Sequence, residues 1–368
     1  MTSSHDWLQQ AAETIRRVSS NKQSLAIKGH GSKSFVGQSV STDETLCTAA
    51  YSGVVNYDPT ELVVVVRCGT PIHELETQLL ESRQMLAFEP PRFGGQGTVG
   101  GMIATGLSGP RRYAAGAAKD FVLGMTVLDA QATQLRYGGT VMKNVAGYDL
   151  SRLHTGALGT LGLIVDVSIK VLPLPPAQAT IALEASAEQG LEWVNQWGGQ
   201  PLPISATSWH QGQLMVRLSG AVAAVQSAQA RLGGQLISQT EADAFWLGLR
   251  DQAHDFFSLD LRDNATHLWR VSVPTTTPQI TAISGDQWME WGGGLRWFKT
   301  DTPADLIRTE ARKHGGHATL YRAADPALLV TAGAFAELAP GLMKVHHRLK
   351  QELDPHRLFN PGRMFAGI

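Results

Sequence analysis

The stretch Gly94-Gly95-Gln96-Gly97-Thr98-Val99-Gly100-Gly101-Met102-Ile103-Ala104-Thr105-Gly106 places six glycines within 13 residues. It interrupts an otherwise ordered and apolar part of the chain, where turns alone do not explain so many glycines. Few side chains obstruct the backbone here, so a long, flat, anionic ligand could lie along it. We therefore expect this stretch to bind a ligand.

A second glycine-rich segment precedes it and follows an expected buried strand at 24–28. This segment reads Ile27-Lys28-Gly29-His30-Gly31-Ser32-Lys33. Successive backbone N–H groups in a glycine turn form a concavity that can hold a phosphate oxygen, and Ser32 adds a hydroxyl donor. The segment matches neither G-x-x-x-x-G-K-[ST] nor G-x-G-x-x-G. Taken alone, it fits a tight turn without a ligand better than a binding loop.

The third glycine-rich region lies further along the chain. It comprises Asn144-Val145-Ala146-Gly147-Tyr148-Asp149-Leu150 and then Gly156-Ala157-Leu158-Gly159-Thr160-Leu161-Gly162-Leu163-Ile164. The strand expected after the last glycine starts apolar, which suits a planar ring packed against backbone. A loop–strand connection inside a core is the alternative.

The composition excludes several classes of protein. The 368 residues are 43% hydrophobic and 17% charged, with a net charge of -1, which argues against non-specific binding to nucleic acid or to anionic membranes. Cys47 and Cys68 form no C-x-x-C, so we expect no disulfide framework, zinc ribbon or iron–sulfur cluster within this chain. The first 20 residues have helical spacing without the apolar core of a secretion signal, and no run approaches 18 apolar residues. We expect a soluble protein of a reducing compartment, the cytoplasm.

The pattern of strands and helices predicts an α+β fold. Buried strands are expected at 62–66, 121–128 and 161–172, a helix at 71–82, and a boundary at Pro173, Pro175 and Pro176. Residues 180–238 then show the order β-α-β-β-α-β of a ferredoxin-like unit. A looser echo spans 268–322, with a helix expected near 277–284, and together the two units predict one antiparallel sheet covered on one face by helices. The expected domains are 1–177, 178–335 and a C-terminal helix and tail at 336–368.

Together the glycine-rich segments resemble the PCMH-type FAD-binding domain of the vanillyl-alcohol oxidase superfamily, over about residues 5–177 and the C-terminal tail. Residues 29–33 resemble its pyrophosphate loop and 98–101 its second FAD loop. Residues 159–162 are similar to its G-T-L-G turn, and Asp354-Pro355 with Phe359-Asn360-Pro361-Gly362 to its closing motif. Within the superfamily, residues 119–124, 141–150 and 315–322 closely resemble the FAD-binding subunits of bacterial glycolate oxidases.

The resemblance implies that the chain binds FAD in its first domain. Some relatives attach the flavin covalently through a histidine of the first loop, but aligning the glycines puts Ser32 rather than His30 at that position. We therefore expect non-covalent FAD. The implied FAD-binding residues are Lys28, Gly29, His30, Gly31, Ser32, Lys33, Thr98, Val99, Gly100, Gly101, Thr105, Gly106, Asn144, Gly147, Tyr148, Gly159, Thr160, Gly162, Ile164, Asn360 and Pro361.

The second domain lacks the substrate motifs of related dehydrogenases. Relatives that oxidise D-2-hydroxy acids carry G-D-G-N-x-H and E-H-G patterns that bind a metal, whereas His314-Gly315-Gly316-His317 has no carboxylate beside it. We therefore expect no metal site. A flavin dehydrogenase needs a base for the hydroxyl proton and a cation for the carboxylate. The candidates are His317, Tyr321, Arg322, Arg111 and Arg112, and the sequence does not choose among them.

What the resemblance implies is an FAD-dependent oxidoreductase subunit of a complex that oxidises glycolate or D-lactate to the 2-oxo acid. The implied partners are a larger FAD- and substrate-binding glycolate oxidase subunit and an iron–sulfur subunit that carries electrons onward. No nucleic acid and no direct membrane insertion are expected. Two alternatives stay open: a self-sufficient flavin oxidase of a small hydroxy acid or alcohol, and a scaffold subunit that FAD merely stabilises.

Overall fold

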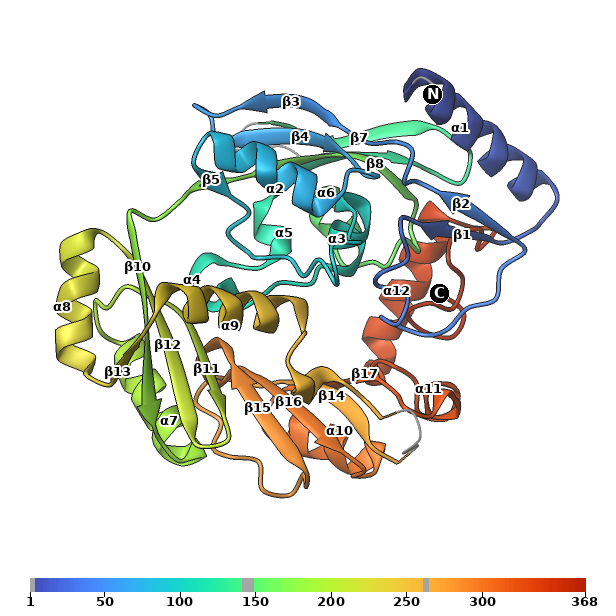
Figure 1. Ribbon diagram of the computed structural model, residues 1–368. Coiled ribbons are helices and arrows are strands. Elements are labelled where there is room, and N and C mark those ends of the chain that lie inside the picture. The colour runs from blue at the N-terminus through green and yellow to red at the C-terminus, as the bar shows by residue number, and fades with distance from the viewer. Residues whose placement is uncertain (1–3, 141–148, 261–264) are drawn as a thin grey trace. The chain divides into compact units, whose positions relative to one another are not determined.

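The computed structural model describes residues 4–140, 149–260 and 265–368. The chain divides into two compact units, which Figure 1 shows in ribbon form. The first contains residues 1–107, 117–173 and 337–368, so the C-terminal segment returns to the N-terminal part of the chain. The second contains 174–336 together with the short segment 108–116, which nothing in the sequence sets apart from its neighbours.

The first unit is built on a five-stranded antiparallel sheet in the order β3-β4-β8-β6-β7. In β4, Val63 and Val64 point to opposite faces of the sheet and are both buried, which explains why four valines follow one another at 63–66. The expected buried strands are thus present. The strands of this sheet are β3 (Val54–Asp58), β4 (Val63–Arg67), β6 (Val122–Leu128), β7 (Gln134–Gly138) and β8 (Leu163–Lys170).

Helices of the first unit are amphipathic or short. In α1, Trp7, Ala11, Ile15 and Val18 are buried along one face. No helix in the described parts of the chain is both long and apolar enough to cross a membrane. The helices are α1 (Ser4–Ser20), α2 (Ile72–Glu81), α3 (Val99–Thr105), α5 (Ala118–Phe121), α6 (Leu150–His154) and α12 (Pro340–Leu353).

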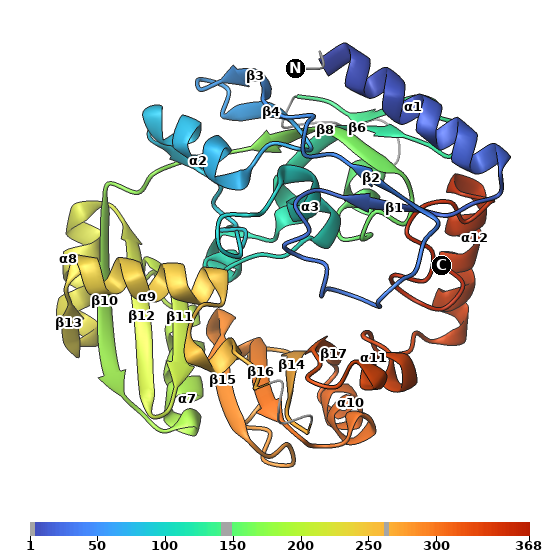
Figure 2. The ribbon, with the colours of Figure 1, turned by 45° about the vertical axis from the view of Figure 1, so that its right-hand side comes forward.

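A small parallel pair, β1 (Leu25–Lys28) and β2 (Glu44–Cys47), leads into the first glycine turn. The C-terminal tail adds to β1, since Leu25 N–H donates to the carbonyl of Leu358 at 2.7 Å and Asn360 N–H donates to the carbonyl of Leu25 at 3.0 Å. Figure 2 shows this pair beside α12 and the C-terminus. Another short antiparallel pair, β5 (Gln84–Met85) with β9 (Leu172–Pro173), completes the strands of this unit.

The second unit is one eight-stranded sheet in the order β13-β10-β12-β11-β15-β16-β14-β17, and all its pairs are antiparallel. Two four-stranded halves join through β11 and β15. The predicted α+β class with an antiparallel sheet is confirmed. The strands are β10 (Ala177–Glu184), β11 (Ile204–His210), β12 (Gln213–Gly220), β13 (Gln235–Ile237), β14 (His267–Ser272), β15 (Asp286–Glu290), β16 (Leu295–Thr300) and β17 (His317–Arg322).

Helices lie on both faces of this sheet, whereas the sequence predicts cover on one. Ile181, Val216 and Leu218 face the core under α7 (Ala187–Gly198) and α8 (Val222–Leu232). The alternate residue Thr180 accepts a hydrogen bond from Trp246 Nε1 of α9 (Gln239–Asp251) at 2.9 Å, so α9 covers the opposite face. The signal for α9 is the Ser-x-x-Glu pattern at 238–241, and the side chain of Ser238 caps the helix by accepting from Glu241 N–H.

The helix expected near 277–284 is absent, because the chain makes turns there. The segment has weak helix propensity, since Ile280, Thr281 and Ile283 are β-branched. The remaining helical elements of this unit are α4 (Arg112–Ala115), α10 (Ala304–Lys313), α11 (Pro326–Ala332), and the 3-10 turns η1 (Asp255–Phe257) and η2 (Trp291–Gly293).

Candidate functional site

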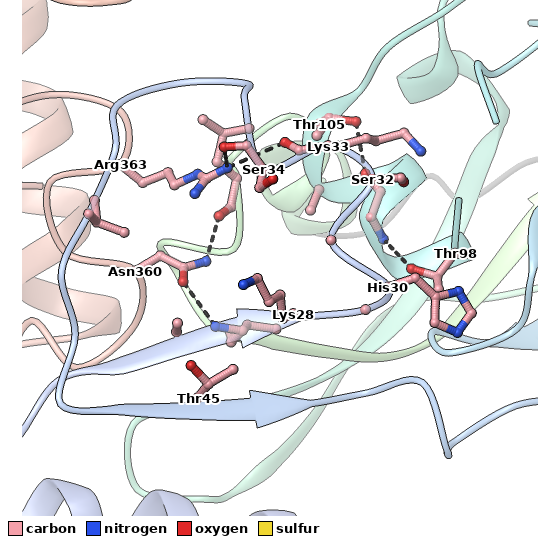
Figure 3. A pocket seen from close by; sticks show the side chains of 18 of the residues that line it. Lys28, His30, Ser32, Lys33, Ser34, Thr45, Thr98, Thr105, Asn360 and Arg363 are labelled. Carbon is pink, nitrogen blue, oxygen red and sulfur yellow. Dashed lines mark hydrogen bonds between the residues drawn. The ribbon is translucent and has the colours of Figure 1, made fainter. Parts of the chain in front are cut away.

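The first unit contains a cavity of about 320 Å³ where the glycine-rich segments meet the C-terminal tail (Figure 3). A smaller pocket of about 60 Å³ adjoins it and shares Ile27, Gly29 and Asn360 with it. The larger cavity is lined by Ala26, Ile27, Lys28, Gly29, His30, Gly31, Ser32, Lys33, Ser34, Ser39, Val40, Thr42, Thr45, Thr98, Gly101, Ala104, Thr105, Leu158, Asn360 and Arg363.

Hydroxyl groups and positive charge dominate the larger cavity. Seven serines and threonines line it, together with the cations Lys28, Lys33 and Arg363. None of the residues that line it is an aspartate or a glutamate. Burial lowers the pKa of Arg363, whose guanidinium donates to the carbonyl of Ser34 at 2.8 Å. The chemistry of this lining therefore fits an anion that accepts several hydrogen bonds, such as a diphosphate.

Two glycines allow the segments to touch. A Cβ at position 29 would lie 2.4 Å from Thr98 Oγ1, and one at position 100 would lie 2.9 Å from Cys68 Cβ. Neither position has room for a side chain. The glycines that suggest open backbone in the sequence thus serve close contact between segments, and the cavity forms beside that contact.

The backbone N–H groups of residues 99–101 already donate to acceptors within the protein. Val99 N–H donates to the carbonyl of Thr70, Gly100 N–H to that of Cys68, and Gly101 N–H to Thr98 Oγ1. This stretch therefore presents the side-chain hydroxyl of Thr98 to the cavity more than backbone amide. Thr105 also lines the cavity, and its hydroxyl donates to the carbonyl of Gly101 at 2.8 Å.

Asn360 joins the first and third glycine-rich segments through its side-chain amide. Its Oδ1 accepts from Ile27 N–H at 2.9 Å, and its Nδ2 donates to the carbonyl of Leu158 at 2.8 Å. Gly159 must be a glycine here, since its φ is +69° and a Cβ would lie 2.8 Å from Asn360 Nδ2.

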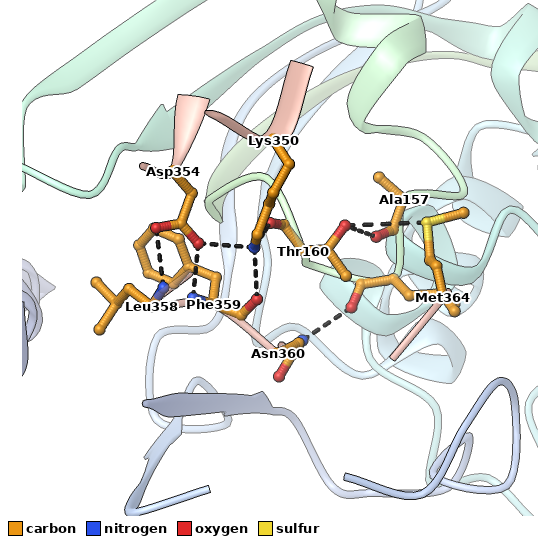
Figure 4. A network of polar contacts seen from close by, with 9 residues as sticks. Ala157, Thr160, Lys350, Asp354, Leu358, Phe359, Asn360 and Met364 are labelled. Atoms are coloured by element: carbon orange, nitrogen blue, oxygen red, sulfur yellow. Dashed lines mark hydrogen bonds and ion pairs between the residues drawn. The ribbon is translucent and has the colours of Figure 1, made fainter. Parts of the chain in front are cut away.

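A buried ion pair holds the tail that carries Asn360 (Figure 4). Lys350 Nζ lies 2.7 Å from Asp354 Oδ2, and it also donates to the carbonyls of Thr160 at 2.6 Å and Phe359 at 3.1 Å. Asp354 accepts from the N–H groups of Leu358 and Phe359, both at 2.9 Å. The carboxylate and the ammonium thus have several hydrogen-bond partners, which a buried pair needs to be stable.

The structure brings most of the predicted FAD-binding residues together. Lys28, Gly29, His30, Gly31, Ser32, Lys33, Thr98, Gly101, Thr105 and Asn360 line the larger cavity, and Gly100, Gly159, Gly162 and Ile164 line the smaller pocket. Val99, Gly106, Thr160 and Pro361 line neither. Asn144, Gly147 and Tyr148 lie outside the described residues.

Several lining residues escape sequence reasoning. Arg363 directly follows the closing motif, and its position there is a signal that could have been used. The hydroxyls of Ser39, Thr42 and Thr45 come from the loop before β2 and from β2 itself, where nothing in the local sequence marks a site.

Comparison with known proteins agrees with this geometry. Residues 8–138 match the FAD binding domain family, so the predicted cofactor, FAD, is confirmed. The glycolate oxidase subunit GlcE of Escherichia coli (strain K12) is 43% identical over 363 residues, which cover 99% of both chains. The chain belongs to the GlcE family of glycolate oxidase subunits.

More distant relatives share parts of the chain. A D-lactate dehydrogenase of Anaerostipes hadrus is 25% identical over 256 residues, covering 68% of this chain and 51% of that protein. The glycolate oxidase subunit GlcD of Bacillus subtilis (strain 168) is 39% identical over 84 residues, 23% of this chain and 18% of GlcD. Among solved structures, p-cresol methylhydroxylase superposes with a TM-score of 0.72 over 100% of this chain and 88% of its own, at 15% identity, which shows a shared fold.

The candidate catalytic residues belong to the second unit, and two of them are held by other protein groups. Arg322 donates to the carbonyl of Phe257 at 3.1 Å and to Gln252 Oε1 at 3.0 Å. Arg111 donates to Gln178 Oε1 at 3.2 Å. These contacts give both arginines a structural role.

His317 and Tyr321 lie on the same strand, β17. Burial raises the pKa of Tyr321, whose hydroxyl accepts from Gln252 Nε2 at 3.0 Å. Burial and the nearby charge of Arg270 lower the pKa of His317, which favours its neutral, proton-accepting form. Arg270 is absent from the sequence-derived candidates.

Proposed function

We propose that this chain is the FAD-binding flavoprotein subunit of a glycolate oxidase complex that oxidises glycolate, or D-lactate, to the 2-oxo acid. The observation that carries the proposal is the cavity where the glycine-rich segments of a GlcE-family chain meet. It is lined by three cations and seven hydroxyls, with no carboxylate among its lining residues. Such a lining suits the diphosphate of FAD and disfavours a cationic ligand.

Particular residues would hold each part of the cofactor. Lys28, Lys33 and Arg363 would offset the diphosphate charge, and Ser32 and Thr98 would donate hydrogen bonds to it. The smaller pocket, lined by Gly159, Gly162 and Ile164 among others, would take the flat ring. The chemistry that bound FAD supplies is the two-electron oxidation of an alcohol carbon.

We propose that the partners divide the remaining tasks. A larger subunit related to D-lactate dehydrogenases would bind FAD and substrate, and an iron–sulfur subunit would carry electrons onward. This chain would then be the second flavoprotein, with residues 1–177 as its FAD domain, 178–335 as its cap and 336–368 closing the FAD domain. The complex would lie in the cytoplasm and reach the membrane only through its partners.

The first experiment tests the cofactor and its attachment. The chain is purified alone, its visible spectrum is recorded, and the protein is precipitated with acid. We expect a yellow protein whose flavin stays in the supernatant, because the attachment is non-covalent. A colourless protein would overturn the proposal, and colour in the pellet would overturn non-covalent binding and direct attention to Ser32 and His30.

The second experiment tests the role within the complex. Glycolate-dependent dye reduction is measured for the chain alone and for the chain co-expressed with its partner subunits. We expect activity only with the partners. Full activity of the chain alone would favour the self-sufficient oxidase. Unchanged activity of a complex that carries a cavity-filling Gly100→Trp variant, shown to lack FAD in this subunit, would favour the scaffold.

A further inference from the structure

The second unit carries an arginine cluster on the sheet face that α9 covers in part. Arg270 of β14 stands opposite Trp297 of β16. The flanking residues Trp269 and Val271 point into the core under α10, so Arg270 points to the other face. Its guanidinium lies 5.1 Å from the ring centroid of Trp291 and 6.0 Å from that of Trp297.

Aromatic contacts stabilise the charge of Arg270 but leave its donors unused. A ring face attracts a cation electrostatically, yet it accepts none of the five N–H groups in a conventional hydrogen bond. Among the residues that the structure describes, none accepts a hydrogen bond from Arg270 or forms an ion pair with it. A half-buried guanidinium in this state calls for an anionic partner.

A second arginine adds positive charge beside the first. The guanidinium of Arg112 lies 4.3 Å from the same Trp291 ring. Among the described residues, the carboxylate that acts on Arg270 is that of Glu290, which accepts from Trp297 Nε1 at 2.7 Å. Burial and the charge of Arg112 both lower the pKa of Arg270, so an anion bound beside Arg270 would stabilise its charged form.

We infer that Arg270 and Arg112 form a binding site, within the second unit, for the carboxylate of a small organic acid. A planar guanidinium presents paired N–H groups that match the two oxygens of a carboxylate. Tyr321, whose ring packs against Trp297 at 4.9 Å, and His317, whose pKa Arg270 lowers, lie close to the same arginine. The inference goes beyond the proposed function, in which the larger subunit binds the substrate, because it gives this chain an acid-binding site of its own.

The test uses the full-length chain purified with its FAD and oxalate as an unreactive probe. Oxalate binding is measured by isothermal titration calorimetry for the unchanged chain and for R270Q, R270K, R112Q and a control, R231Q. Arg231 is an arginine of α8 in the same unit whose side chain donates to Gln200. We expect R270Q and R112Q each to weaken oxalate binding about 10- to 100-fold, the range for loss of a hydrogen bond between charged groups. R270K keeps the charge but loses the paired donors, so its oxalate affinity should lie between those of R270Q and the unchanged chain. R231Q should bind oxalate as tightly as the unchanged chain does.

Folding and anion selectivity are checked in parallel. Flavin absorbance and thermal unfolding show whether each variant folds. If R270Q does not fold, R112Q and R270K together provide the test. Equal oxalate affinity in the unchanged chain and in folded R270K and R112Q, or no oxalate binding to the unchanged chain, would overturn the inference. Equally tight binding of inorganic phosphate would overturn its assignment to carboxylates.

These outcomes differ from a failure of the proposed function. That failure would appear as a chain without flavin, or as a complex that oxidises glycolate without this subunit. Neither result depends on whether oxalate binds to Arg270 and Arg112.

Discussion

The side-chain amide of Asn360 donates a hydrogen bond to the carbonyl of Leu158 at 2.8 Å, across 202 positions of the chain. The same side chain accepts from Ile27 N–H, so one residue of the tail joins β1 to the third glycine-rich segment. Its φ of +40° is a conformation that asparagine tolerates better than most residues. The C-terminal tail is therefore part of the cavity wall.

Asn360→Asp should weaken FAD binding at least about tenfold, since like charges placed together cost several kcal/mol. The variant keeps the acceptor for Ile27, but it sets an oxygen against the carbonyl of Leu158 and adds negative charge to a cavity that lacks carboxylates. FAD affinity is measured by titrating the apoprotein.

The matched control is Asn195→Asp in the second unit, where Asn195 Nδ2 donates to the carbonyls of Leu191 and Thr275. This variant should lower stability and leave FAD affinity unchanged. If Asn360→Asp also left the affinity unchanged, the tail would have no part in the cofactor site.

Gly29→Ala should reduce FAD affinity and lower the melting temperature. The added Cβ would lie 2.4 Å from Thr98 Oγ1, so the two segments must separate, and overpacking of this kind costs about 1–3 kcal/mol. Gly341→Ala in α12 serves as the control, because a Cβ there meets nothing within 4 Å. A Gly29→Ala protein that behaves like Gly341→Ala would show that the segments need no close contact.

Lys350→Met should destabilise the first unit by about 3–5 kcal/mol, because removing one member of a buried pair leaves the charge of Asp354 uncompensated. Urea unfolding followed through flavin release provides the measurement. The control is Lys313→Met, which removes the exposed lysine of an ion pair with Glu310 and should cost less than about 1 kcal/mol. Equal effects of the two variants would contradict a stabilising role for the buried pair.

His154 should make stability depend on pH. Burial lowers the pKa of His154 to about 4, whereas an unfolded histidine titrates near 6.5. Between these values the unfolded chain binds a proton that the folded chain excludes, so stability falls as the pH falls through this window. The total loss is up to about 3 kcal/mol, of which about 2 kcal/mol has gone by pH 5.

The urea midpoint at pH 7.5 and at pH 5 is compared between the unchanged chain and His154→Gln, which does not titrate. The difference between the two pH values should be smaller in the variant, because other titrating groups contribute equally to both proteins. An identical difference would exclude His154 as a source of the pH dependence.

Local sequence predicts much of the first unit and its cofactor. The valine run of β4, the amphipathic spacing of α1 and the clustered glycines each act over short distances along the chain, so pattern alone identifies them. The N-cap residue Ser238 also marks the start of α9 in the sequence, although sequence analysis did not identify that helix. The helix expected at 277–284 follows only from the echo of the first ferredoxin-like unit, and the chain makes turns there instead.

Which polar groups converge is decided by the tertiary structure. Lys350 meets Thr160 across 190 positions, and Arg363 meets Ser34 across 329, and no local pattern encodes either contact. In the sequence, Arg270 is an ordinary polar residue of a strand with alternating side chains. The pairing of β14 with β16 places it beside Trp297, and the turn after β15 brings Trp291 close to its guanidinium. From the sequence alone, the clustered glycines predicted an anionic ligand, and the resemblance of these segments to a known FAD-binding domain implied that the ligand is FAD. The tertiary structure decided the rest. The return of the C-terminal tail places Arg363 at the cavity, and long-range strand pairing places Arg270 beside the aromatic rings.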